Sequence, residues 1–463
     1  MTVYILGAGP TGMALAQGLA EQGKTPFVLI ESEEEQGGLA RTVASPGLGR
    51  HDLGPHKLYS ADPALMARVK NLLPADQWLV RPKLSRIYLE GHFLPYPPSP
   101  LSLLRLFGVR ALSDMALDFI CARARRPTAP AATFEEDLSQ RVGVGLYQRF
   151  FRPMAEKIWG DPTQLDARLS RDRVQLPTLG DFFRRRTGRF EAPHFYYPRG
   201  GLQTLWRAME RGFSTQHQRL FHHRATGLSW NGERVTGVTV QNRGTRQEHC
   251  FSVGPDDFVF STLPLRTLSA LSPEWGEPLH QRIREASPAQ DLLLVFIKIN
   301  EPRLLNESWI FVPDPGIPFH RVSEQNAFDP AMTPSGSIVC CEFMGGPARP
   351  LGEKSDGDLA NGAVDGLRRM GYRFSVENTR VIRLPASYPV MRPGADERRD
   401  GILAALDEFD NFRSIGRQGS AHYVGTLDAM DIGFGAARWL DGGRTRARWA
   451  DERRRTRRYP ILD

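Results

Sequence analysis

The sequence has few cysteines and no long hydrophobic run. Its four cysteines include no C-x-x-C pair, and Cys340 and Cys341 are adjacent in an apolar stretch, so we expect buried thiols of a reducing compartment. Neither a disulfide framework nor a zinc site is expected. No apolar stretch approaches the roughly 18 residues that a membrane-spanning helix needs. A strand begins directly at the amino terminus and leaves no room for a signal peptide, so we expect a cytoplasmic protein.

Positive charge is concentrated near the end of the chain. The formal net charge is +8, and residues 444–458 contribute eight arginines against Asp451 and Glu452, which is 8 − 2 = +6. We interpret this segment as a solvated carboxy-terminal helix or a frayed end, and less often as a contact for anionic lipid or an acidic partner. No nucleic-acid-binding motif accompanies it, so no nucleic-acid partner is expected.

The length excludes a single compact core. Cores stop growing at roughly 250 to 300 residues, so a chain of 463 residues is expected to form two or three domains. Hydrophobic residues at 41% and charged residues at 24% are typical of a globular protein.

The first thirty-one residues contain the pattern of a dinucleotide-binding unit. A strand at 3–6 is followed by the glycine turn Gly7-x-Gly9-x-x-Gly12, a helix that ends near Gly23, and a second strand that ends in Glu31. Such glycines allow a tight turn and a close approach to a pyrophosphate at the helix amino terminus. A carboxylate at the tip of the second strand can accept hydrogen bonds from an adenosine ribose.

A second glycine pair indicates which dinucleotide binds. Gly37, Gly38 and Arg41 follow the second strand, and this arrangement resembles the extended fingerprint of glutathione-reductase-type flavoproteins, in which the glycine pair and the arginine approach the FAD diphosphate. The predicted cofactor is therefore FAD.

Four further segments resemble the superfamily of FAD-dependent amine oxidases, protoporphyrinogen oxidases and UDP-galactopyranose mutases. They lie at 51–59, with the G-P-H motif that includes His56; at 156–162, with E-K-x-W-G; at 197–202, with Y-P-x-G-G; and at 416–437, with the carboxy-terminal flavin motif. The resemblance covers about residues 1 to 440. It implies an α/β fold, with a Rossmann-type, glutathione-reductase-like FAD-binding domain and an inserted helical and mixed α+β substrate domain.

The resemblance also implies a discontinuous domain organisation. Residues 1–95, 191–270 and 385–440 are expected to form the FAD-binding domain, 96–190 a helical insertion, 271–384 the substrate-domain sheet, and 441–463 a basic tail. Within the insertion, Leu101 to Arg126 has an apolar stripe with arginines, which fits a helix packed on the substrate domain better than a helix pair that touches membrane lipid.

Candidate site residues follow from the same segments. For the third flavin motif we expect Gly416, Arg417, Gly419 and Asp428 to contact the cofactor. The catalytic candidates are His56, Arg321 and Tyr388, of which His56 stands in the flavin-facing loop of the resemblance and could transfer a proton. The substrate-binding candidates are Trp159, Arg168 and Arg171, although a solvated helix is the favoured explanation for at least two of the nearby arginines. No metal site is expected.

Two functions remain open. The first is an FAD-dependent oxidoreductase of the protoporphyrinogen oxidase or amine oxidase type, which transfers a hydride from a small-molecule substrate to flavin. The alternative resembles UDP-galactopyranose mutase, which isomerises a nucleotide sugar with reduced flavin. The sequence does not distinguish the substrate or the oligomeric state.

Overall fold

The amino-terminal half of the dinucleotide unit folds as the sequence predicts. The computed structural model describes residues 1–124, 129–174, 194–345 and 351–459. β1 (Val3–Leu6), α1 (Pro10–Gln22) and β2 (Phe27–Ile30) follow one another, and both strands are fully buried. Short apolar strands of this kind are typical of a parallel sheet that is covered on both faces.

A five-stranded parallel sheet collects strands from distant parts of the chain. Its order is β19-β13-β1-β2-β9. The added strands are β9 (Gln218–Leu220), β13 (Phe258–Ser261) and β19 (Phe412–Ser414). Helices α9 (Leu202–Arg211) and α15 (Thr426–Asp441) pack beside α1. The remaining helices of this part are α2 (Pro63–Lys70), α10 (Leu265–Ala270), α11 (Glu277–Ala286) and α13 (Ala395–Asp407).

A three-stranded antiparallel ribbon adjoins this sheet. β10 (His223–Asn231) and β11 (Arg234–Asn242) form a hairpin, with Gly232 in the left-handed region at φ +59°, and β12 (Glu248–Ser252) completes the ribbon. The turn pair Asn231-Gly232 is a sequence signal typical of such hairpins.

The second sheet has seven strands in the order β18-β14-β17-β16-β15-β6-β7. Cys341 and Phe343 of β17 face α12 (Asp356–Arg369), whereas Cys340 and Met344 face the hairpin of β3 (Thr42–Ser45) and β4 (Gly49–Asp52). The other strands are β6 (Ser85–Leu89), β7 (His92–Pro95), β14 (Ala289–Ile299), β15 (Trp309–Phe311), β16 (Arg321–Glu324), β17 (Ser337–Gly345) and β18 (Val376–Pro389). A separate two-stranded sheet pairs β5 (Trp78–Pro82) with β8 (His194–Pro198).

Two predicted boundaries are wrong for this sheet. Residues 85–95 belong to it through β6 and β7 rather than to the dinucleotide domain, and β18 continues past residue 384 to Pro389. No local pattern predicts these boundaries, because β6 joins the sheet through parallel pairing with β15, a strand more than two hundred residues later.

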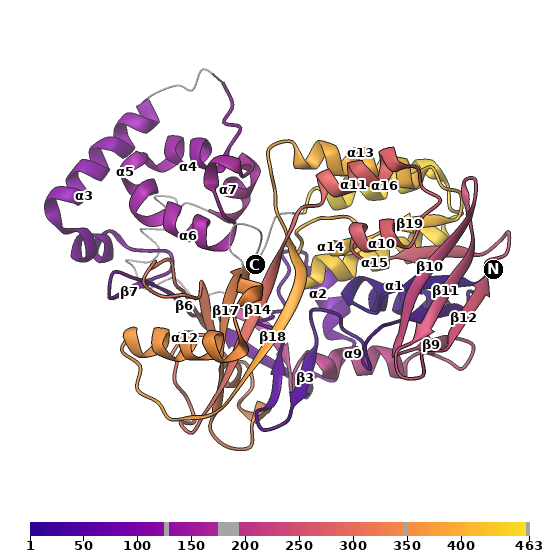
Figure 1. Ribbon diagram of the computed structural model, residues 1–463, viewed down its shortest axis with the longest axis horizontal. Helices are drawn as coiled ribbons and strands as arrows, with labels where there is room; N and C mark the ends of the chain where they lie inside the picture. The colour runs from indigo at the N-terminus through magenta and orange to yellow at the C-terminus, as the bar shows by residue number, and fades with distance from the viewer. Residues whose placement is uncertain (125–128, 175–193, 346–350, 460–463) are drawn as a thin grey trace.

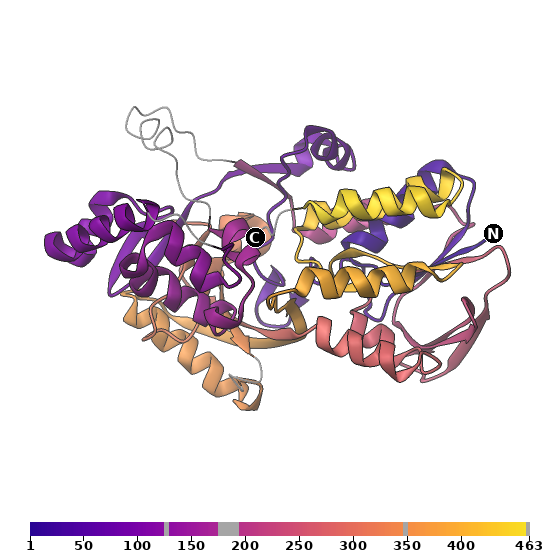
Figure 2. The same ribbon diagram turned by 90° about the horizontal axis from the view of Figure 1, so that it is seen from above.

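The helical insertion forms one end of the molecule (Figures 1 and 2). The end of this predicted insertion, residues 175–190, together with Arg125 and Arg126, lies outside the described residues. Its helices are α3 (Pro100–Ala124), α4 (Phe134–Val142), α5 (Val144–Leu146), α6 (Arg152–Ile158) and α7 (Ala167–Arg173), with a π-helical turn at Tyr147–Phe151. None of the described helices is both long and apolar enough to cross a membrane.

The apolar residues of α3 are not all packed inside. Met115 is buried, but Leu101, Val109, Leu117 and Ile120 are exposed. The expectation of a helix with a buried apolar face therefore holds for one side of α3 only. Cysteine burial is likewise divided, since Cys340 and Cys341 are buried and Cys121 and Cys250 are exposed, all four as free thiols.

The basic carboxy-terminal segment is not a solvated tail. Its helix α16 (Arg446–Arg457) buries Trp449 against Trp439, with ring centroids 4.9 Å apart. Arg453 donates to both oxygens of Asp407 at 2.8 and 2.9 Å, and Arg457 pairs with Asp400 at 2.9 Å. The charge count missed this docking because the acidic partners lie on α13, far away in the sequence.

Candidate active site

The glycine turn after β1 has no space for side chains. A Cβ on Gly7, which has φ +101°, would lie 2.3 Å from Oγ1 of Thr262, and a Cβ on Gly12 would lie 1.9 Å from the carbonyl oxygen of Gly7. Helix α1 starts here without a side-chain cap and without an acidic residue in its first turn. Its amino terminus therefore suits a phosphate group.

Glu31 stands at the end of β2, where the ribose ligand was predicted. Its buried carboxylate accepts hydrogen bonds from the backbone N–H groups of Ala8 at 2.8 Å and Glu33 at 3.0 Å. The carboxylate thus fixes the glycine turn to the second strand. Contact with a ribose remains a prediction.

The second glycine pair touches the first turn. A Cβ on Gly38 would lie 3.0 Å from Cα of Gly9, so the two backbones approach as closely as glycine permits. Arg41 is ion-paired with Glu33 at 2.9 Å and donates to the carbonyl of Gly38 at 3.3 Å. The predicted diphosphate residues Gly9, Gly38 and Arg41 therefore lie together in space.

The third predicted flavin segment closes onto the same place. A Cβ on Gly416 would lie 2.5 Å from Oγ1 of Thr11, and one on Gly419 would lie 2.9 Å from the carbonyl oxygen of Ser261. Asp428 lies in the first turn of α15, and burial raises its pKa to about 6. Residues 416–428 thus meet the glycine turn although about four hundred residues separate them.

The β3–β4 hairpin leads the chain to His56. Asp52, at the end of β4, is buried and accepts hydrogen bonds from Thr42 at 2.5 Å and from the hydroxyl of Tyr197 at 2.7 Å. Burial raises the pKa of this carboxyl to about 6. Asp52 was not among the predicted site residues, although an acid in the G-P-H segment was a visible signal.

His56 is half-buried and carries two cationic neighbours. Burial, followed by the nearby guanidinium groups of Arg321 and Arg417, lowers the pKa of its imidazole to about 4. The ring is therefore neutral at pH 7 and able to accept a proton. The structure thus brings together three of the predicted residues.

Arg321 is held by a buried carboxylate that the sequence analysis did not single out. Its Nε and Nη2 atoms donate to Glu342 at 2.5 and 2.7 Å, from the paired positions of β16 and β17. Bidentate pairs of this kind fix the guanidinium plane. The lone acid in the apolar run of β17 was the signal that could have identified Glu342.

An aromatic and cationic cluster lies next to His56. The guanidinium carbon of Arg417 is 5.1 Å from the ring centroid of Tyr388 and 4.4 Å from that of Tyr423. Arg173 stands 4.4 Å from Tyr423 and 5.9 Å from Trp159. Of the predicted residues, Tyr388, Arg417 and Trp159 therefore belong to one cluster, and Arg173 and Tyr423 complete it. Its charge and rings suit an anionic substrate with a flat or cyclic part.

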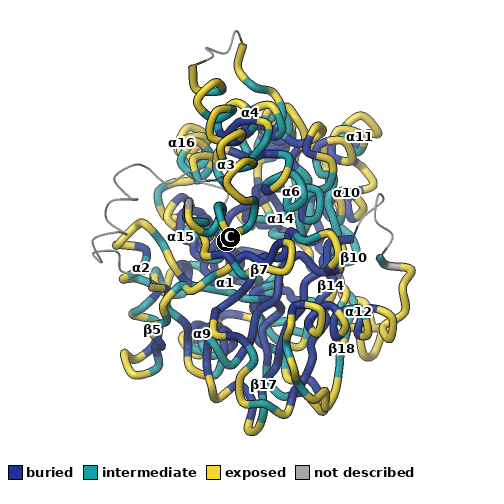
Figure 3. The backbone as a smooth tube through the Cα atoms, turned by 90° about the vertical axis from the view of Figure 1, so that its left-hand side faces the viewer, coloured by how far each residue is buried: buried dark blue, intermediate teal, exposed yellow. Residues whose placement is uncertain are grey.

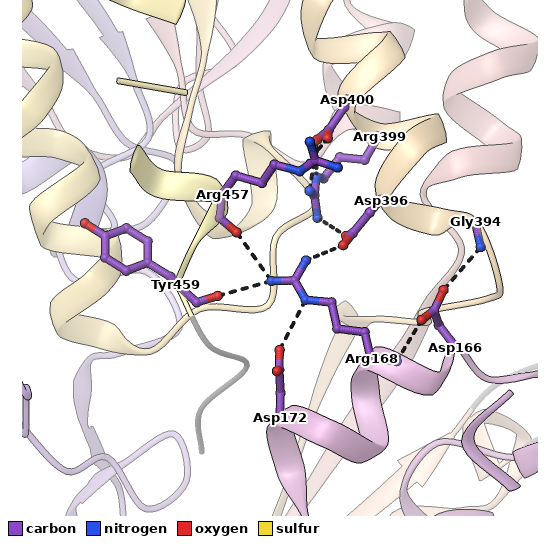
Figure 4. Close-up of polar contacts among 9 residues, drawn as sticks. All are labelled: Asp166, Arg168, Asp172, Gly394, Asp396, Arg399, Asp400, Arg457 and Tyr459. Carbon is purple, nitrogen blue, oxygen red and sulfur yellow. Dashed lines mark hydrogen bonds and ion pairs between the residues drawn. The ribbon is translucent and has the colours of Figure 1, made fainter. Parts of the chain in front are cut away.

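Arg168 lies elsewhere and is fully engaged (Figure 4). It forms ion pairs with Asp172 at 3.2 Å and with Asp396, and it donates to the carbonyls of Arg457 and Tyr459 at 3.3 Å each. These contacts join α7 to α13 and to the carboxy-terminal helix. The structure therefore places Arg168 away from the aromatic cluster, and its substrate role stays a prediction.

Arg171 also lies away from the aromatic cluster, and its substrate role stays a prediction. Its guanidinium pairs with Asp137 at 3.1 Å, and its side chain is 54% exposed on the outer side of α7. In sequence, Arg168, Arg171 and Arg173 look alike. Only Arg173, at the end of the helix, faces the aromatic cluster.

Comparison with known proteins gives the same fold. Residues 5–72 match the NAD(P)-binding Rossmann-like domain. The chain is 26% identical over 168 residues to a probable UDP-galactopyranose mutase of Klebsiella pneumoniae, a match that spans 36% of this chain and only 43% of that protein.

Solved structures resemble the chain over almost its whole length. A reduced UDP-galactopyranose mutase has a TM-score of 0.81 at 19% identity and covers 98% of this chain and 96% of its own. A putative protoporphyrinogen oxidase from Exiguobacterium sp. 255-15 has a TM-score of 0.71 at 16% identity, with 95% and 98% covered. A putrescine oxidase variant has a TM-score of 0.60 at 15% identity, with 96% and 100% covered.

The fold is therefore that of the solved UDP-galactopyranose mutase, protoporphyrinogen oxidase and putrescine oxidase structures, which confirms the predicted fold class and the resemblance in fold. The comparisons do not identify a substrate.

Proposed function

We propose that the protein is an FAD-dependent oxidoreductase that acts on an anionic small molecule. The observation that carries this proposal is the cluster of Arg417, Tyr388, Tyr423 and Trp159, together with His56, whose pKa is lowered by burial and by the charges of Arg321 and Arg417. Arginine side chains over aromatic rings suit a substrate with carboxylate or phosphate groups.

The residues of the chain fit FAD. Close contacts allow no side chain at Gly7, which lies against the Thr262 side chain, at Gly38, which lies against the backbone of Gly9, or at Gly416, which lies against the Thr11 side chain. These glycines keep the turn bare, as the close approach of a dinucleotide requires. The uncapped amino terminus of α1 would hold the diphosphate, Glu31 the ribose, and the segment from Gly416 to Asp428 the flavin end. When bound, FAD supplies the capacity to accept a hydride.

Side chains of the protein would bind the substrate and accept its proton. Arg417 and Arg173 would bind and orient the anionic group of the substrate against the tyrosine rings. His56, neutral at pH 7, would accept the proton that leaves as a C–H or N–H bond of the substrate is oxidised. Glu342 keeps Arg321 fixed beside the imidazole.

A second candidate is redox-neutral isomerisation of a nucleotide sugar. The same arginine and tyrosine cluster favours it, because a nucleoside diphosphate combines a double anion with a flat ring. The similarity to UDP-galactopyranose mutases supports this candidate as well. For either function we propose a cytoplasmic location, because the sequence predicts thiols of a reducing compartment.

The first experiment tests the cofactor and the reaction class together. Purified protein is expected to take up FAD, and the oxidised holoenzyme is then mixed without oxygen with amines, porphyrinogens and nucleotide sugars. Bleaching of the flavin by one compound supports the oxidoreductase. Turnover of a nucleotide sugar by the reduced enzyme only, without net flavin oxidation, selects the mutase. Protein that remains colourless and binds no FAD contradicts both.

His56→Asn is expected to keep its fold and FAD content and to lower the turnover rate about 10²- to 10⁴-fold, since the proton acceptor is lost. The exposed His92 provides a matched control, and His92→Asn should leave the rate unchanged. Melting temperature, flavin content and rate are measured on the same samples. A His56→Asn protein that is less stable but fully active would give this histidine a structural role only.

A further inference from the structure

Tyr459, the last residue that the structure describes, is held at its side chain and at its backbone. Its hydroxyl donates a hydrogen bond to the carboxylate of Asp431 and accepts one from Arg455 at 2.6 Å. Its backbone N–H donates to the carbonyl of Thr456 at 3.2 Å. Helix α16 is exposed along most of its length, whereas α14 (Gly416–Gly419) is buried or partly buried (Figure 3). Tyr459 is therefore fixed in place although it follows a surface helix.

The carbonyl of Tyr459 contacts helix α7. It accepts a hydrogen bond from Nη2 of Arg168 at 3.3 Å, and the carbonyl of Arg457 accepts another from the same atom at 3.3 Å (Figure 4). Arg173 is the last residue of the same helix, and its guanidinium carbon lies 4.4 Å from the ring centroid of Tyr423. Hydrogen bonds along a helix keep its residues in a fixed relation. The contact at Arg168 therefore fixes the helix that carries Arg173.

The backbone of Tyr459 also contacts His422, which directly precedes Tyr423. Burial lowers the pKa of the His422 imidazole to about 3, and a backbone hydrogen bond with Tyr459 acts against this shift. The N–H of His422 donates to the carbonyl of Arg417 at 3.0 Å, and the Arg417 guanidinium donates to the carbonyl of Val424 at 3.0 Å. The loop 417–424 is thus closed on itself, and its contact with Tyr459 fixes the loop as a unit.

Tyr459 therefore joins the two walls of the substrate cluster. One wall is α7 with Arg173, and the other is the loop 417–424 with Arg417 and Tyr423. The guanidinium carbons of Arg173 and Arg417 both lie 4.4 Å from the ring centroid of Tyr423. Two cations on one ring repel each other, so this arrangement needs support from outside the cluster. The contacts of Tyr459 supply such support to both walls.

We propose that Tyr459 is a positioning residue for the substrate site, which holds Arg173 and Arg417 on opposite walls and so keeps a binding place for an anionic group ready. Because the like charges are already held together, a substrate does not have to supply the free energy that brings them together. This inference rests on the proposed function, since it requires that the cluster binds an anion.

The test is calorimetric titration of the full FAD-loaded protein with inorganic pyrophosphate. Tyr459→Ala is expected to raise the Kd about tenfold, because the arrangement that can bind falls to about a tenth of the molecules. Tyr459→Phe loses only the hydroxyl contacts, and its Kd should lie between those of wild type and Tyr459→Ala. The Kd for FAD should stay unchanged. A merely structural role would lower the melting temperature and leave the Kd for pyrophosphate of the folded protein unchanged.

Two further variants serve as controls. Arg458→Gln changes the exposed neighbour of Tyr459 and should bind pyrophosphate as wild type does. Arg173→Gln should weaken binding, which shows that the anion occupies the cluster. If wild type binds pyrophosphate and Tyr459→Ala has the same Kd, the inference is overturned and the proposed function stands. A wild type that binds no pyrophosphate contradicts the anionic site of the proposed function, and this inference with it.

Discussion

At the scale of single residues, buried ionisable groups surround the β3–β4 hairpin. His51 is fully buried, lies 2.8 Å from Oγ of Ser45 through Nε2, and has its ring centroid 3.8 Å from that of Phe296. Burial lowers the pKa of His51 to about 4. Asp52 has the opposite shift, because burial raises its pKa to about 6. His51 and Asp52 are adjacent, but their contributions to the pH dependence of stability therefore have opposite signs.

The sign for His51 follows from proton binding. Between pH 6.5 and about 4 the unfolded chain binds a proton at His51 and the folded chain does not, so stability from this residue is present above pH 6.5 and lost as the pH falls. The loss is about 2 to 3 kcal/mol.

His51→Gln is expected to reduce the fall in the free energy of unfolding between pH 7 and pH 4.5. Urea unfolding of wild type and variant at several pH values measures this fall in the free energy of unfolding. Asp52 contributes in the opposite direction, since the stabilisation that it provides increases as the pH falls below about 6. Asp52 is present in both proteins, so its contribution cancels in the difference between them. Parallel pH profiles for wild type and variant would contradict the buried, neutral state of His51.

At the scale of elements, the contact between α1 and α15 positions the third flavin segment. A Cβ on Gly433 would lie 2.2 Å from the carbonyl oxygen of Thr11, and Thr11 donates its hydroxyl to the carbonyl of Ala429 at 2.8 Å. The helices therefore meet backbone to backbone where α1 begins. A close approach of this kind tolerates no added atom, because backbone groups cannot move aside.

Gly433→Ala is expected to lower the free energy of unfolding by about 2 to 4 kcal/mol and to weaken FAD binding, since α15 is pushed away from the glycine turn. Denaturant unfolding and FAD titration provide the two measurements. Gly357→Ala, in α12, is the matched control because the nearest atom to its Cβ would be 3.8 Å away. If both variants behave like wild type, the two helices are not packed as closely as described.

At the scale of the whole molecule, Arg168 joins three distant parts of the chain. Its partners belong to α7, α13 and the carboxy-terminal segment, and Arg399 and Arg457 extend the network to Asp400 (Figure 4). The insertion that carries Trp159 and Arg173 is thereby tied to the domain that carries Arg417.

Arg168→Met is expected to destabilise the protein by about 2 to 4 kcal/mol, because Asp172 and two carbonyl groups lose this cation and Asp396 keeps only Arg399. It should also increase protease cleavage near the carboxy terminus, which limited proteolysis detects. Arg171→Met is the control, since this exposed arginine has Asp137 as its ion-pair partner. Equal stability and equal cleavage of the two variants would show that Arg168 does not hold the parts together.

The sequence by itself determined the elements that depend on neighbouring residues. The glycine turn, α1, β2 and the hairpin at Gly232 were predictable, because a few consecutive residues fix their backbone angles and their apolar period. The resemblance also predicted that distant segments would meet near His56. What remained open was which of several similar side chains would lie there.

Only the tertiary structure decided that choice. Arg168 and Arg173 stand on the same short helix, yet one reaches Asp396 and the carboxy-terminal segment while the other faces Tyr423. Glu342 pairs with Arg321 because two strands of the second sheet align them, and the basic segment docks because α13 presents acids to it. Ion pairs and cation–aromatic contacts depend on the distance between residues in space, and the local pattern of a sequence does not contain that distance.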